Sequence, residues 1–154
     1  MRASTRFPLA VHTLMIVSAF SDQRKINSDF IAESTGVNAV IIRNIFTRLK
    51  KAGLISVSPG PGGATLSKKP MQITLLDIFN AVEAEKTEDI FRFHGNPSPY
   101  CPIGSNIYEI LYSHLDNAVS ALKKELNSVT LAHLINELNQ RVPNLPPPPG
   151  KMRT

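Results

Sequence analysis

Apolar residues between positions 28 and 51 recur at the three- and four-residue spacing of helices that pack on a core. A short helix is expected to begin at Asn27 or Ser28, both good N-cap residues, and to end near position 34. Gly36 can then adopt the positive φ that a sharp helix exit requires. Asn38 caps the next helix, whose apolar stripe consists of Ile42, Ile45, Phe46 and Leu49. The spacing predicts a helix-turn-helix.

Two short strands are expected directly after this unit. Ile55 and Val57 indicate the first strand and Thr65 and Leu66 the second, and residues 58–64 supply prolines and glycines for the turn between them. A hairpin in this position is typical of the wing of a winged helix. A plain surface loop is the alternative interpretation.

The N-terminal apolar run predicts a buried first helix, Phe7–Phe20, with Pro8 in its first turn. The run is too short to cross a membrane. The alternative is a secretory signal, because Val17-Ser18-Ala19 resembles a signal-peptidase site.

Capped helices alternate with loops in the second half of the chain. Thr74 is expected to cap a helix that reaches Val82 and packs under the first helix, and Thr130 to cap a short final helix. Residues 86–102 read as an irregular loop, and the tail from about position 141 is proline-rich and expected to be disordered.

The longest helix is expected to span about Ile103–Leu126. Its apolar surface is too wide for a helix with a single neighbour, so a second copy of the chain is expected to cover part of it. A core helix within one chain is the alternative. The predicted dimer interface is Ile103, Ile107, Tyr108, Leu111, Leu115, Ala118 and Leu122.

The fold class is therefore mainly α with a small β-hairpin: a winged helix-turn-helix domain plus a long dimerisation helix. We divide the chain into a winged-helix domain (1–85), a loop (86–102), the dimerisation and C-terminal helices (103–140) and a disordered tail (141–154).

Charge is distributed unevenly over the 154 residues. The formal net charge is +5, but residues 1–70 hold ten Lys or Arg against three acids, whereas residues 71–154 hold seven against nine. A basic half that coincides with the helix-turn-helix is typical of proteins that bind nucleic acid.

Enzymatic and metal chemistry find little support in the composition. A single cysteine excludes an internal disulfide and an all-cysteine metal site, and the four histidines have no metal-ligand spacing. No Ser/His/Asp set or phosphate-loop motif is present. We therefore predict no catalytic residues, no metal and no cofactor.

Several segments occur in an order that is specific to one protein family. They are Ile31-Ala32-Glu33, Thr35-Gly36-Val37, Phe46 to Leu54, Gly60-Pro61-Gly62-Gly63, Ile73 to Ile78 and Cys101-Pro102-Ile103-Gly104. In these segments the chain resembles the Rrf family of bacterial winged-helix transcription regulators, which includes the iron–sulfur cluster regulator and the cysteine-metabolism repressor. The resemblance implies a cytoplasmic homodimer that is not bound to a membrane, joins through its long helix and represses transcription from a pseudo-palindromic operator.

Two departures from the family pattern change the expectation. Only Cys101 matches the three cysteines that hold a cluster in some members, and one thiolate is too few to bind an iron–sulfur cluster. Pro59 stands near the position of a wing arginine that some relatives place in the minor groove. We predict a variant that binds no cluster and whose wing has no arginine to read the width of the minor groove.

The residues predicted to contact DNA lie on the second helix of the helix-turn-helix and around it. Arg43 is the candidate for a bidentate contact to guanine and Asn44 for one to adenine, while Val40 either touches a thymine methyl or belongs to the core. A solvated surface role is the alternative for each basic residue. The full set is Arg2, Thr5, Arg6, Ser28, Asn38, Ala39, Val40, Arg43, Asn44, Thr47, Arg48, Lys50, Gly60, Gly62 and Gly63.

Cys101 is a redox candidate, with an inert small residue as the alternative. A small ligand between the loop and the long helix is a further possible signal. The rival function is a protein-interaction adaptor whose winged helix has lost DNA binding.

Overall fold

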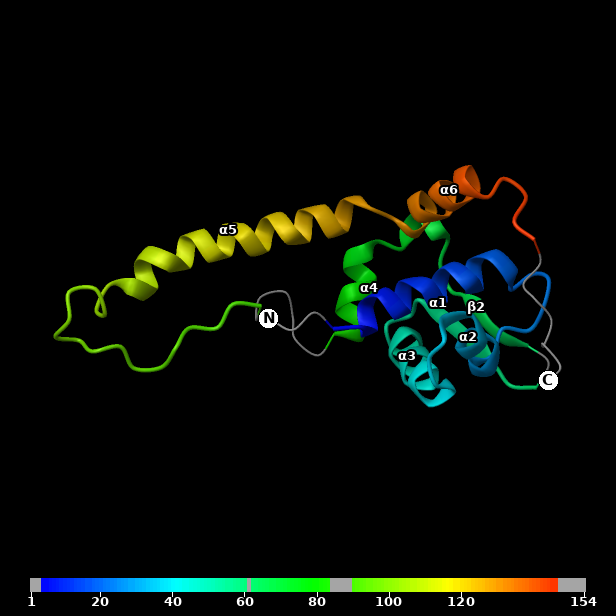
Figure 1. The fold of residues 1–154 in the computed structure, drawn as a ribbon, viewed down its shortest axis with the longest axis horizontal. Helices are drawn as coiled ribbons and strands as arrows, with labels where there is room; N and C mark the ends of the chain where they lie inside the picture. The colour runs from blue at the N-terminus through cyan, green and yellow to red at the C-terminus, as the bar shows by residue number, and fades with distance from the viewer. Residues whose placement is uncertain (1–3, 61, 84–89, 147–154) are drawn as a thin grey trace.

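The computed structural model describes residues 4–60, 62–83 and 90–146. Among them it confirms a mainly α-helical winged-helix fold with one two-stranded antiparallel sheet (Figure 1). The elements are α1 (Arg6–Phe20), α2 (Ser28–Thr35), α3 (Ala39–Lys51), β1 (Ile55–Ser58), β2 (Gly63–Leu66), the 3-10 turn η1 (Pro70–Gln72), α4 (Leu75–Val82), α5 (Ile107–Ser128) and α6 (Leu131–Arg141).

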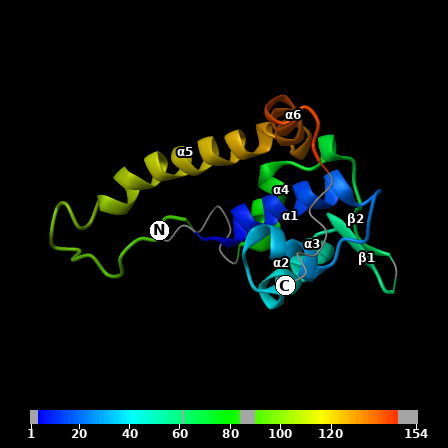
Figure 2. The same cartoon turned by 45° about the vertical axis from the view of Figure 1, so that its right-hand side comes forward.

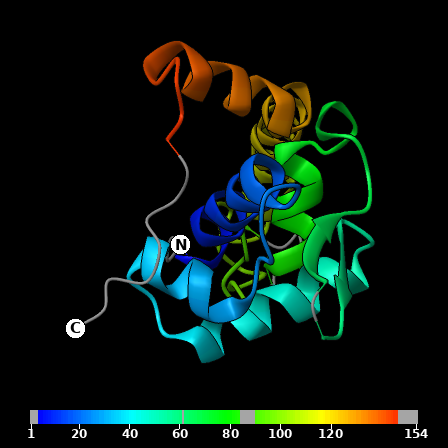
Figure 3. The same cartoon turned by 90° about the vertical axis from the view of Figure 1, so that its right-hand side faces the viewer.

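The centre of the body is α1, as its apolar sequence predicts. It contacts α2, α3, α4, α6 and β2, and Leu14 and Val17 are fully buried. Figure 3 shows α3 and α6 on opposite sides of α1, which contacts both. The rings of Phe7 and Phe79 pack edge to face with centroids 5.5 Å apart, so α4 packs against α1 as expected.

The predicted caps begin the helices where the sequence puts them. Asn27 accepts a hydrogen bond from the Phe30 N–H at 2.9 Å, which starts α2. Thr74 and Asp77 form a reciprocal capping box at the start of α4. Gly36 ends α2 with φ 70°, in the left-handed region.

The hairpin is an antiparallel pair in which Ile55 lies opposite Leu66 and Ser58 opposite Gly63. Ile55 and Ala64 are buried, which fixes the inner face of the wing on the body. In Figures 1 and 2 the wing lies at the end of the body opposite to the far end of α5.

The long helix begins at Ile107, so the prediction that it begins at Ile103 is wrong. Residues 101–106 form successive turns, in which the Ser105 N–H donates to the Cys101 carbonyl and the Asn106 side chain donates to the Pro102 carbonyl at 2.8 Å. These side-chain and turn bonds compete with helical ones. Ile103 consequently lies outside the helix, with 72% of its surface exposed.

The C-terminal helix packs on the body through η1 and α1, and in Figure 3 it runs across the view, whereas α5 is seen nearly end-on. The Leu131 N–H donates to the Ile73 carbonyl at 2.8 Å, and the Leu75 N–H donates to the Val129 carbonyl at 2.9 Å. Leu131 is fully buried. This junction attaches the near end of α5 firmly to α4, while the far end projects away from the body.

Candidate nucleic-acid interface

The sequence of α3 divides its surface into a buried stripe and an exposed face. Ile42, Ile45, Phe46 and Leu49 are buried, as predicted. The helix starts where the Asn38 side chain accepts from the Val40 N–H at 2.8 Å. It ends in a Schellman pair of hydrogen bonds, from Gly53 to the Lys50 carbonyl and from Leu54 to the Leu49 carbonyl.

The exposed face of α3 carries five of the fifteen residues predicted to contact DNA. Val40 is 56% exposed, so it is not a core residue. Arg43, Asn44, Thr47 and Lys50 are exposed as well, whereas Ala39 is half-buried. This face has cationic, amide and apolar groups, the types that hydrogen-bond guanine and adenine edges or touch thymine methyls.

Arg43 is held against the start of α2. Its Nε donates to Ser28 Oγ at 3.2 Å, and its Nη2 lies 3.7 Å from Asp29 Oδ1. The structure therefore brings together Ser28 and Arg43, which are both predicted site residues. Asp29 is the third residue of this cluster, and the sequence analysis did not include it. Two helices of the helix-turn-helix thus share one polar cluster at the surface.

A groove of about 1000 Å³ runs beside α3 on its α1 side. It brings the predicted residues Thr5 and Arg6, at the start of α1, beside Asn44, Thr47 and Arg48 of α3. The other lining residues are Ile41, Ile45, Lys51, Ala52, Asn80 and Ala81. Three cations on one groove next to the exposed face of α3 would suit a phosphate backbone.

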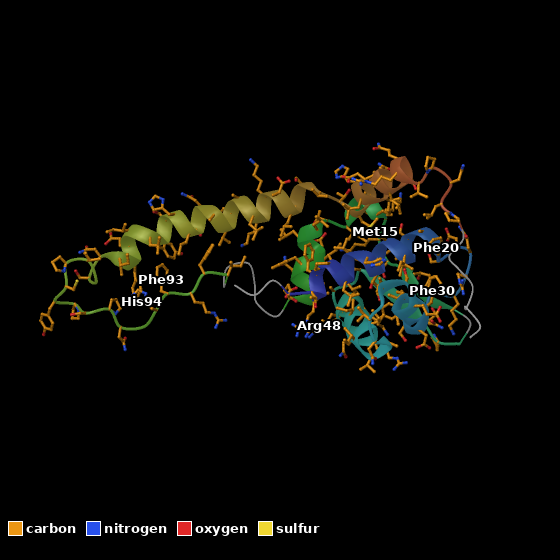
Figure 4. The ribbon with its side chains drawn as sticks, in the orientation of Figure 1. Met15, Phe20, Phe30, Arg48, Phe93 and His94 are labelled. Carbon is orange, nitrogen blue, oxygen red and sulfur yellow. The ribbon has the colours of Figure 1, made fainter. Side chains whose placement is uncertain are left out.

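Arg48 has a structural partner as well. Its Nη1 donates to the Val82 carbonyl, at the end of α4, at 3.3 Å. The residue is half-buried and lies at the α4 side of the body (Figure 4). Its guanidinium is therefore partly used to join α3 to α4.

The wing packs on the body through the loop end of β2, at Gly63 and Ala64. The Ala64 N–H donates to the Ile26 carbonyl at 2.8 Å. Gly63 has φ 76°, is buried, and would place a Cβ 2.8 Å from both Ile26 N and Ile26 O. Gly63 therefore joins the wing to the body, whereas Gly60 and Gly62 are exposed.

Lys25, the chain neighbour of Ile26, also contacts the wing, because its Nζ donates to the Gly60 carbonyl. The predicted set omitted Lys25. It also omitted Ile41, which lies on α3 with 46% of its surface exposed. The sequence could have indicated that Ile41 is exposed, because in a helix it lies about 100° around the axis from the buried Ile42 and therefore off the buried stripe. No sequence signal links Lys25 to Gly60. Arg2 lies outside the described residues.

The long helix presents an apolar face with few neighbours. Of the predicted interface, Ile107, Tyr108 and Leu115 are half-buried, and Leu111, Ala118 and Leu122 are exposed. Tyr108 also anchors the preceding loop: its hydroxyl donates to the His94 carbonyl, and the centroids of its ring and the Phe93 ring lie 4.7 Å apart. Figure 4 shows Phe93 and His94 on this loop, beside α5.

Cys101 is exposed in the turns before α5. Backbone N–H groups of Gly104 and Ile103 bond its sulfur and lower the pKa of the thiol. Within residues 4–60, 62–83 and 90–146, no group of three His, Cys, Asp or Glu side chains could hold a metal ion. None of the described helices is long and apolar enough to cross a membrane.

Comparisons with known proteins identify the family and the fold of the chain. A family model described as "Rrf2: Iron-dependent Transcriptional regulator" matches residues 3–137. YwnA of Bacillus subtilis (strain 168), named as an HTH-type transcriptional regulator, is 35% identical over 135 residues, which cover 88% of this chain and 98% of YwnA.

Two solved structures have the same fold. One, from Lactobacillus plantarum and described as a transcriptional regulator, has a TM-score of 0.72 at 28% identity and covers 87% of this chain and 89% of that one. The other, IscR of T. potens, has a TM-score of 0.69 at 20% identity and covers 92% of this chain and 91% of that one.

Proposed function

The chain belongs to the Rrf2 family of DNA-binding transcriptional regulators, and we propose that it acts as a homodimeric repressor of a pseudo-palindromic operator. The relatives are regulators and not enzymes. The observation that carries the proposal is the exposed face of α3, which is flanked by a basic groove on one side and followed by a wing. A second copy would supply the second reading helix.

Binding would place the first turns of α3 in the major groove. Arg43 and Asn44 would then face base edges, with Asn38, Ala39 and Val40 at the entering end. The wing tip would approach the DNA backbone through Gly60 and Gly62. The phosphates would be contacted by Thr5, Arg6, Ser28, Thr47, Arg48 and Lys50. Gly63 is left out of this role because it is buried.

The homodimer is supported by the apolar surface of α5. Besides Leu111 and Leu122, Ile110 is 61% exposed and Tyr112 is 63% exposed on a helix that projects from the body. Apolar side chains at this density on a projecting helix favour association. A twofold dimer would present two copies of α3 to half-sites whose centres lie one helical turn, about 34–36 Å, or a multiple of it apart.

A salt-dependent gel shift tests DNA binding. A pool of randomised duplexes should yield one enriched, twofold-symmetric sequence, and its affinity should fall steeply as salt rises. If no sequence is enriched and no duplex binds at low salt, the adaptor function is favoured instead. Repression requires a reporter whose promoter overlaps that sequence, and transcription should fall when the protein is present.

Analytical ultracentrifugation tests the dimer. Leu111→Glu should shift the protein toward a monomer and weaken operator binding, because it adds a charge to the apolar face. Ser113→Glu is the matched control, since Ser113 is exposed and lies about 200° around the helix from Leu111. Equal dimerisation of both variants would argue against α5 as the interface.

Regulation through Cys101 is part of the proposal. The exposed thiol, with its lowered pKa, lies just before the helix that would join the two subunits. Its oxidation would alter the turns that precede α5, at the end of this helix away from the body, and through the dimer contact the spacing of the reading helices. The test compares the operator affinity of wild type and Cys101→Ser before and after peroxide treatment; identical responses would leave a small ligand as the remaining signal.

A further inference from the structure

The contacts of Arg43 leave one edge of its guanidinium group for a ligand. Nε and Nη2 form the edge that faces Ser28 and Asp29 at 3.2 and 3.7 Å. Within the described part of the chain, Nη1 makes no hydrogen bond. The guanidinium is therefore oriented by one edge, while the end formed by Nη1 and Nη2 faces away from α2.

We propose that Ser28 and Asp29 are positioning residues that hold Arg43 ready to read a guanine, and that they thereby determine the specificity of one base pair. The inference rests on the proposed DNA-binding function. Guanine O6 and N7 accept from the two terminal nitrogens of an arginine, the end that the α2 contacts leave open. Fixing a long side chain before binding lowers the conformational entropy that binding must remove.

Charge explains why a carboxylate at this surface favours base readout over a phosphate contact. Asp29 repels phosphates, so on any duplex it reduces affinity unless its charge is balanced by Arg43. The side chain of Arg43 is 59% exposed and that of Asp29 is 70% exposed, so their ion pair contributes little to folding stability. Its effect should therefore be found in orientation and in discrimination between sequences.

The test uses the duplex that the full-length wild-type protein selects from a randomised pool. Its guanines are replaced one at a time, and the ratio of the two dissociation constants gives the preference at each position. Wild type should show one guanine with a preference of roughly 5- to 150-fold that disappears in Arg43→Met, which has no donor for guanine. Asp29→Asn and Ser28→Ala should each reduce this ratio by about 2- to 5-fold. Affinity for unrelated DNA should stay equal or rise in Asp29→Asn, whereas Ser28→Ala also removes a proposed phosphate contact and should weaken binding to all duplexes alike.

The matched control is Glu33→Gln, which removes an equal charge from an exposed position on α2. It should change binding to all duplexes alike and leave the ratio intact. In an Arg43→Met background, Asp29→Asn should have no further effect on the ratio.

Outcomes separate the inference from the proposed function. If the selected duplex binds and Asp29→Asn and Ser28→Ala both leave the guanine preference at the wild-type value, the positioning role is wrong although DNA binding stands. If no duplex is selected at all, the proposed function itself fails. Thermal unfolding of each variant checks that a lower ratio does not come from loss of the α2 start, where Asp29 also favours the helix dipole.

Discussion

Gly63→Ala should destabilise the protein much more than Gly53→Ala, although both glycines have almost the same backbone conformation. Gly63 has φ 76° and Gly53 has φ 71°. A new Cβ at Gly53 meets nothing within 4 Å, whereas at Gly63 it would lie 2.8 Å from two backbone atoms of Ile26. The pair of variants therefore separates the cost of the positive φ from the cost of the contact.

The magnitudes follow from these two terms. An alanine in the left-handed region costs roughly 1–2 kcal/mol, and the lower entropy of the unfolded chain returns about 0.4–1 kcal/mol. Gly53→Ala should thus lower the free energy of unfolding by about 1 kcal/mol. At Gly63 the backbone of β2 or of Ile26 must also move, which weakens the bond from Ala64 to Ile26 and disturbs packing. We expect a further loss of about 1–3 kcal/mol.

Urea unfolding followed by far-UV circular dichroism measures both variants against wild type. The midpoint should decrease in the order wild type, Gly53→Ala, Gly63→Ala, with slopes unchanged. DNA affinity of folded Gly63→Ala should also decrease, because the wing can no longer rest on the body. Equal midpoints for the two variants would refute the reasoning, since they would mean that the close approach to Ile26 has no energetic consequence.

Three further predictions concern the core, a cap and the thiol. Leu49→Ala removes a fully buried side chain and should lower the free energy of unfolding by about 2–5 kcal/mol; a loss below about 1 kcal/mol in urea would contradict its place in the core. Asn38→Ala removes the cap of α3 and should cost about 1 kcal/mol, while Asn38→Ser should restore most of it, and thermal unfolding of the two compares them. The pKa of the Cys101 thiol is lowered in the folded chain, so its alkylation rate should rise with pH around a lower midpoint than in urea-unfolded protein; coincident midpoints would show that the bonds from Gly104 and Ile103 have no effect.

Local rules were enough to predict most of the helix-turn-helix. Asn27 and Asn38 cap α2 and α3, Gly36 takes the left-handed conformation, and the stripe from Ile42 to Leu49 is buried. These features depend on residues within four positions of one another, where backbone hydrogen bonds and side-chain spacing act directly. The family resemblance is confirmed by the family model that matches residues 3–137 and by the 35% identity to YwnA.

The start of α5 shows where such rules stop. Ile103 has the right spacing for the apolar face of the helix, but the turns from Cys101 to Asn106 satisfy the backbone with hydrogen bonds to other partners. Apolar periodicity alone could not tell an exposed turn residue from the first residue of a helix. The remaining assignments of residues to DNA and to the dimer interface stay predictions.

The sequence by itself determined the kind of protein: the order of its helices, the wing and the reading helix follow from short-range spacing and capping. Only the tertiary structure decided which surface residues work together. Ser28 and Asp29 meet Arg43, Lys25 meets Gly60 and Gly63 meets Ile26 across 14 to 37 positions of chain. Contacts over such separations depend on how whole elements pack, and no local pattern of residues encodes them.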